Sequence, residues 1–164
     1  MRIIVNLLMG LMLFATAGLV FYVQQDADLE TSKVDQLKNA VVMLRTQSML
    51  QPASEKVDAL PNGHAKSIEQ AWFEPVPTNP FAPKHTPWLE VSNNIKLKHP
   101  EYITFGDKRS AFWYNPHLGI VRARVSQQIS QVATYELYNQ VNRTHLSERA
   151  HTSQIVDKVA DAAK

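Results

Sequence analysis

The sequence predicts an α+β protein in which a long N-terminal membrane helix continues into an amphipathic helix and a small antiparallel sheet domain follows. Three observations predict this class: an uncharged apolar run, a stretch free of Pro and Gly that carries a heptad stripe, and four short strand-like runs. We expect five segments: a cytoplasmic stub and transmembrane helix at 1–23, an extracytoplasmic amphipathic helix at 24–51, a proline-rich connection at 52–87, the sheet domain at 88–142 and a polar tail at 143–164.

The apolar run covers residues 3–23, where 17 of 21 positions are hydrophobic and none is charged. At 1.5 Å per residue such a helix is about 30 Å long, which matches the hydrocarbon core of a bilayer. Arg2 precedes the run and acidic residues follow it, so we expect a single pass in the inner membrane with the N-terminus cytoplasmic and the bulk periplasmic.

A cleaved signal peptide is the alternative reading of this run, because Ala15-Thr16-Ala17 fits a small-x-small cleavage site. Cleavage there would leave an apolar new N-terminus, and Arg2 is the only charged side chain before the run. An uncleaved anchor therefore fits the sequence better.

The helix is expected to continue until Pro52, which ends it at about Gln51. Four apolar residues of this part follow a and d spacing, and the same register carried back into the span places two polar residues on that face. Polar residues in a bilayer usually face protein. We therefore expect a partner helix on the face formed by Asn6, Thr16, Val34, Leu37, Val41 and Leu44. The alternative is that the apolar stripe packs on the chain's own domain.

Seven of the nine prolines lie between 52 and 87, so this segment is expected to be extended or turning. Beyond it, strands are predicted at 88–91, 102–105, 111–114 and 120–125. The loop between the last two reads as a hairpin with a positive φ at Gly119. Alternation in the last strand places Arg122 and Arg124 outward. A helix is expected over 127–142, with a frayed or weakly helical tail after it.

The chemistry that the sequence can support is narrow. With no cysteine and a net charge of +2, thiolate metal sites, thiol nucleophiles and a nucleic-acid partner are not expected. The six histidines are scattered, and no phosphate loop, dinucleotide turn or serine elbow is present. We expect a non-enzymatic protein without catalytic residues, cofactor or metal.

One stretch is more specific. Residues 111–125 read AFWYNPHLGIVRARV, and residues 137–142 read LYNQVN. Together with the helix-then-sheet plan, they resemble type IV pilins and pseudopilins, and in particular the pilin-like proteins of the mannose-sensitive haemagglutinin (MSHA) pilus system. The residues that match in the sheet domain are Trp113, Tyr114, Asn115, Pro116, Gly119, Arg122 and Arg124.

This resemblance implies a membrane-held accessory protein of pilus biogenesis, or of a type II secretion-like assembly, whose partners are other assembly proteins reached through helix contacts. It does not extend to the prepilin processing site. Leu11 follows Gly10, Ala15 stands where a prepilin has Glu, and the span contains no Glu. The alternative function is an envelope-anchored binding module or cryptic hydrolase that meets its ligand with the two arginines and with Phe112, Trp113 and Tyr114.

Overall fold

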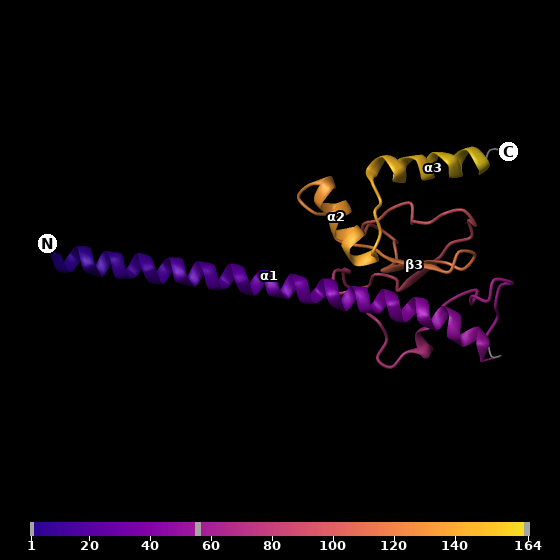
Figure 1. Ribbon diagram of the computed structural model, residues 1–164, viewed down its shortest axis with the longest axis horizontal. Coiled ribbons are helices and arrows are strands. Elements are labelled where there is room, and N and C mark those ends of the chain that lie inside the picture. Colours follow the sequence, from indigo (N-terminus) through magenta and orange to yellow (C-terminus); the bar gives the residue numbers. More distant parts are fainter. Residues whose placement is uncertain (1, 55–56, 163–164) are drawn as a thin grey trace. The chain divides into compact units, whose positions relative to one another are not determined.

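The computed structural model describes the backbone of residues 2–54 and 57–162, and the side chains of 21–22, 24–25, 27–54 and 57–156. Its described residues form three α-helices, a short 3-10 helix and a three-stranded mixed sheet. Figure 1 labels the three α-helices and strand β3. The chain divides into two compact units, Met1–Val34 and Asp35–Lys164. The elements in order are α1 (Arg2–Ala53), η1 (Gln70–Trp72), β1 (Leu89–Val91), β2 (Phe112–Asn115), β3 (Ile120–Ala123), α2 (Gln131–Asn142) and α3 (Glu148–Ala162).

The first unit is helical throughout its described backbone. Most side chains of the expected span at 3–23, including Asn6 and Thr16, lie outside the described residues. Among the residues that are described, no helix has both the length and the apolar character needed to cross a bilayer.

In the second unit, the C-terminal part of α1 buries one face. Leu37 and Leu44 are completely buried, and Val41 is nearly so. The spacing of three and four residues between them is that of one helix face. These residues, with Val34, are the apolar members of the predicted partner face. The burial of Leu37, Val41 and Leu44 inside the chain's own fold is what the alternative reading of the stripe expects.

The end of α1 holds the following loop in place. Pro52 has no N–H to give to the carbonyl of Ser48, four residues earlier. That carbonyl instead accepts from the backbone N–H of Ala65 at 2.9 Å, and the Ala65 carbonyl accepts from the Tyr114 hydroxyl at 2.7 Å. The peptide groups of Ala65 thus join the end of α1 to β2, and α1 ends at Ala53, close to the predicted position.

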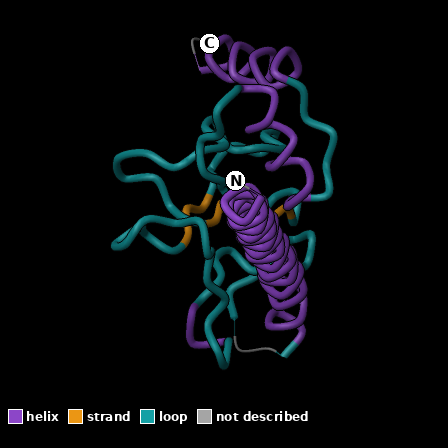
Figure 2. The backbone as a smooth tube through the Cα atoms, turned by 90° about the vertical axis from the view of Figure 1, so that its left-hand side faces the viewer, coloured by secondary structure: helices purple, strands orange, loops and turns teal. Residues whose placement is uncertain are grey.

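The sheet differs from the predicted antiparallel one. β2 and β3 form the expected antiparallel hairpin, but β1 pairs with β2 in parallel, with Leu89 opposite Phe112. The reason is the connection between β1 and β2, which is long enough to return the chain to the end at which β1 began. Figure 2 shows how short the three strands are and how much of this unit is loop.

The strand predicted at 102–105 is reduced to a single parallel bridge between Thr104 and Val125. The Tyr102 carbonyl, which a strand would use in its ladder, accepts from the Arg124 side chain at 2.9 Å. Tyr102 is also half exposed, and its ring lies 3.8 Å from the Arg109 guanidinium carbon. At Tyr102 the Arg124 side chain therefore takes the place of a backbone partner from a neighbouring strand.

The two C-terminal helices are fixed by polar contacts. Ser130 caps α2, because its side chain accepts from the Ala133 N–H, and α2 ends at Arg143 in a left-handed conformation. Of the two alternatives expected for the tail, frayed or weakly helical, the structure has the helical one: the tail forms α3, held by His151. The His151 Nε2 lies 2.8 Å from the Pro100 carbonyl, and its Nδ1 lies 3.0 Å from the Tyr135 hydroxyl. The few apolar residues of the tail give no signal of these polar contacts, which hold α3 in place.

Candidate functional site

The residues that carry the pilin-like match lie on and next to the β2–β3 hairpin, and most of them serve the fold. Trp113 is 2% exposed, and Phe112, Tyr114 and Asn115 are completely buried. Burial raises the pKa of the Tyr114 hydroxyl. The expectation that these aromatic side chains face a ligand is therefore wrong, because both faces of β2 are covered within the chain.

Asn115 and Pro116 fasten two loops to the hairpin. The Asn115 amide nitrogen donates to the carbonyls of Asn94 and Leu97 at 2.8 and 2.7 Å. The Pro116 carbonyl accepts from the Asn62 amide at 2.9 Å. The NPxxG turn is thus a docking point for other loops of the same chain.

Gly119 has φ +62, which confirms the positive φ predicted from the turn. The His64 ring packs directly against it, so that a Cβ at this position would come within 2.1 Å of the His64 Nε2. Gly119 therefore meets a conformational and a steric requirement together.

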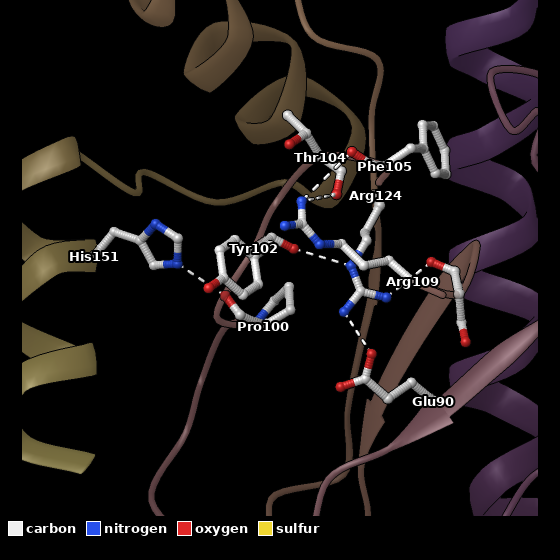
Figure 3. A network of polar contacts seen from close by, with 9 residues as sticks. Glu90, Pro100, Tyr102, Thr104, Phe105, Arg109, Arg124 and His151 are labelled. Carbon is white, nitrogen blue, oxygen red and sulfur yellow. Dashed lines mark hydrogen bonds and ion pairs between the residues drawn. The ribbon is translucent and has the colours of Figure 1, made fainter. Parts of the chain in front are cut away.

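Strand alternation predicted that Arg124 points outward into solvent, and this prediction is wrong. Its side chain is 2% exposed, and its Nη2 lies 2.6 Å from the Glu90 carboxylate. Figure 3 shows this ion pair. Its Nε donates to the Tyr102 carbonyl and its Nη1 to the Ser110 carbonyl, at 2.9 and 2.8 Å. With its donors occupied in this way, Arg124 is a structural cross-link and not a ligand site.

Arg122 is different. It is half buried, and its described hydrogen bond is the one its Nη1 donates to its own neighbour's carbonyl, that of Val121, at 3.3 Å. Its Nε is buried and has no hydrogen-bond partner among the described residues. Burial lowers the pKa of this guanidinium, and the positive charge of Arg45 lowers it further. Arg122 is thus a cation with unused donors.

Arg122 lines a pocket of about 350 Å³ together with three other cations, which we call the basic pocket. Lys38 and Arg45 come from α1, and Arg143 follows α2. Between the charges the wall is apolar and includes Val41, Val42, Ile120 and Val141. Strand alternation marks Arg122 in the sequence, whereas the spacing of the other three cations along the chain shows nothing of their convergence.

The charge of the basic pocket is not balanced from within. Lys38 is paired with the exposed Asp35 at 3.0 Å. In the part of the chain that the structure describes, no carboxylate forms an ion pair with Arg45, Arg122 or Arg143. The pocket thus concentrates positive charge in a place where an anionic group could neutralise it.

The second surface of note is the outer face of α1, by which we mean Val42, Met43, Met49 and Leu50. These side chains are 42–56% exposed, and they recur at seven-residue spacing on the side of the helix opposite the buried stripe. Exposed apolar residues grouped in this way are typical of contact surfaces. The predicted contact residues and the available apolar surface therefore lie on different faces of α1.

Two of the histidines are buried rather than at the surface. The His99 Nδ1 lies 3.1 Å from the Tyr138 hydroxyl, and burial, aided by repulsion from Arg122, His151 and Lys98, lowers the pKa of His99 to about 4. Burial raises the pKa of the Tyr138 hydroxyl. Within the described residues, no group of three or more His, Asp or Glu side chains is arranged to hold a metal ion.

Comparison with known proteins found no matching family model, curated protein or solved structure.

Proposed function

We propose that this chain is a membrane-anchored, non-enzymatic component of type IV pilus biogenesis of the MSHA type, or of a related type II secretion-like assembly. The observation that carries the proposal is the double character of α1. Its N-terminal part has the composition of a membrane span in the sequence, and its C-terminal part is built into the core of an α+β unit through Leu37 and Leu44. A helix used in this way is the plan implied by the pilin-like match in residues 111–125.

The anchor in this proposal is residues 3–23, in the inner membrane, with the bulk of the chain periplasmic. The acidic residues Asp26, Asp28 and Glu30 directly after the run and the single Arg2 before it support this orientation. Asn6 and Thr16 remain the proposed contacts inside the bilayer, because polar side chains there are stabilised by facing another helix.

Outside the bilayer the proposed contact moves from the buried stripe to the outer face of α1. Leu37 and Leu44 have no exposed surface to offer, whereas Val42 and Met49 are nearly half exposed. A partner helix laid along Val42, Met43, Met49 and Leu50 would bury these side chains without opening the fold.

The test replaces Val42 and Met49 by Asp in the full chain, expressed in a bacterium that assembles pili of this type. Each substitution places a carboxylate in the proposed apolar contact, so we expect the double variant to lose co-purification with the assembly proteins and to reduce surface pili. Its thermal midpoint should stay close to that of the unaltered chain, because both positions are exposed.

The matched control is Ile129→Asp with Val132→Asp, which changes two apolar side chains that are 104% and 69% exposed and do not belong to α1. This control should retain both co-purification and pili. Normal co-purification of the Val42 and Met49 variant would remove the outer face from the proposal, and normal pili in a strain that lacks the chain would contradict the function itself.

A further inference from the structure

We propose that the basic pocket binds an acidic segment of a partner polypeptide in which carboxylate side chains alternate with apolar ones. The pocket is formed by Lys38, Arg45, Arg122 and Arg143, all within the unit Asp35–Lys164. The assignment of that partner to an assembly rests on the proposed function, whereas the charge of the ligand rests on the pocket alone.

The buried Nε of Arg122 lacks a hydrogen-bond partner among the described residues. A half-buried guanidinium is stabilised by hydrogen bonds and an opposite charge, as Arg124 is by Glu90. Arg122 has neither at its Nε; Tyr138 favours its charged form, whereas the positive charge of Arg45 opposes it. An anion in the pocket would accept from the unused donors and would also offset the repulsion between the two arginines.

The spacing of the cations along α1 favours an extended ligand. Lys38 and Arg45 are two helical turns apart, about 10 Å along the axis of α1. A single phosphate or sulfate cannot pair with both ends of such a row unless both side chains bend toward one point. A segment with several carboxylates can, and its intervening apolar side chains would face Val41, Ile120 and Val141, which separate the cations.

The surroundings of the basic pocket favour a polypeptide over an acidic polysaccharide. Sugar rings are usually bound against exposed aromatic faces, and the aromatic cluster nearest in sequence to Arg122, Phe112 to Tyr114, is buried. The pocket is instead continuous with the outer face of α1, because Val42 belongs to both. One polypeptide lying along that face would reach the pocket.

The chain's own sequence supplies a probe of the required chemistry. Residues 26–30 read Asp-Ala-Asp-Leu-Glu, with three carboxylates separated by apolar side chains. The experiment titrates the full chain, purified in a non-ionic detergent, into a fluorescently labelled, acetylated and amidated peptide of this sequence and follows anisotropy. The control peptide is Asn-Ala-Asn-Leu-Gln, which keeps the shape and removes the charges.

We expect saturable binding of the acidic peptide that weakens about tenfold when salt is raised from roughly 50 to 300 mM, and no binding of the neutral peptide. Arg45→Gln and Arg143→Gln should each weaken binding about threefold, as exposed charges do. Arg122→Gln should weaken it about tenfold or more, because its donors are shielded from water. Arg149→Gln removes an equal charge from an exposed position on α3 and should change nothing.

Folding of each variant is checked by its thermal midpoint, and Arg122→Lys, which retains the charge, should bind more tightly than Arg122→Gln. Absence of saturable binding, or binding that the three pocket variants leave unchanged, would overturn the proposal. Tighter competition by inorganic phosphate or by polygalacturonate than by the peptide would also overturn it, in favour of a compact anion or a polysaccharide. If the purified chain binds the peptide as expected but a strain that lacks the chain still makes normal pili, the pocket assignment stands and the proposed function is contradicted.

Discussion

At the scale of single residues, the hairpin shows how one position can satisfy two constraints. Gly119 has a left-handed φ of +62, and the His64 ring occupies the space of a Cβ. Gly63 has φ +80 but has nothing within 4 Å of an added Cβ. Comparing substitutions at Gly63 and Gly119 therefore separates the cost of backbone strain from the cost of the steric collision.

We expect Gly63→Ala to lower the free energy of unfolding by about 1 kcal/mol, since only the left-handed backbone is penalised. Gly119→Ala should lower it by about 2–3 kcal/mol, because the His64 ring must also move. Thermal or urea unfolding of the full chain measures both values. In a His64→Ala background, the two substitutions should cost nearly the same; a difference that persists there would show that the collision is not the cause.

His99 predicts a dependence of stability on pH. Its pKa is about 4 in the folded chain and 6.5 in an unfolded one, so below pH 6.5 the unfolded state takes up a proton that the folded state refuses. The contribution of neutral His99 to the free energy of unfolding is fully present above pH 6.5. It is lost as pH falls towards 4, by as much as about 3 kcal/mol. The charged and titratable groups that face His99 are Arg122, His151, Lys98 and Tyr138.

The measurement is the thermal midpoint between pH 7 and pH 4. We expect His99→Gln to be less stable at neutral pH but to lose less stability on acidification, because the refused proton is no longer at stake. His145→Gln changes an exposed histidine and should keep the slope of the unaltered chain. Equal slopes for the His99 and His145 variants would assign the acid sensitivity to other groups.

At the scale of elements, sequence patterns predicted those helices and turns that depend only on residues close together in the chain. The apolar spacing of α1, the proline that ends it, the β2–β3 hairpin and α2 are all encoded within a few residues of where they form. The parallel pairing of β1 is not, since it depends on the path of a long connection. The docking of α3 through His151 and the burial of Arg124 against Glu90 also depend on residues far apart in the chain, and no hydrophobic period reports them.

The candidate site follows the same division. Arg122 could be found because alternation in β3 marks it, whereas Lys38, Arg45 and Arg143 become a site only when α1, β3 and the end of α2 meet. The stripe of α1 was found correctly, but its period cannot say whether an apolar face meets the chain's own core or a partner. Only the tertiary packing of Leu37 and Leu44 separates those two outcomes.

Substitution of the buried stripe should therefore act on folding. Leu37→Asp with Leu44→Asp would place two carboxylates at positions with no solvent exposure, and we expect a loss of several kcal/mol, enough to unfold the unit Asp35–Lys164. Limited proteolysis of the full chain checks this by the disappearance of a resistant fragment. The exposed pair Val42→Asp with Met49→Asp should leave that fragment intact. A resistant fragment in the Leu37 and Leu44 variant would mean that the stripe is not part of the core.

At the scale of the whole molecule, the distribution of charged residues separates an apolar segment, suited to a bilayer, from a remainder suited to water. The run at 3–23 has no charge, whereas the rest of the chain carries all of the 17 basic and all of the 15 acidic residues. The packing of apolar residues in the second unit is supplemented by buried polar cross-links at Asn79, Asn115, Arg124 and Asn142. Such groups are stable when buried because each has its hydrogen-bond partners.

The proposed anchor makes the prediction for the intact chain. If residues 3–23 span the inner membrane, the full chain should remain in the pellet after carbonate extraction, because more than a dozen apolar side chains would be transferred from lipid to water on release. Residues 24–164, exported behind a cleavable signal, should instead be found in the soluble fraction. Intact mass of the membrane form should include the whole apolar run. A mature N-terminus at Gly18 would identify a cleaved signal peptide and remove the anchor, whereas one at Leu11 would show that the chain is processed like a prepilin despite Ala15 in place of Glu.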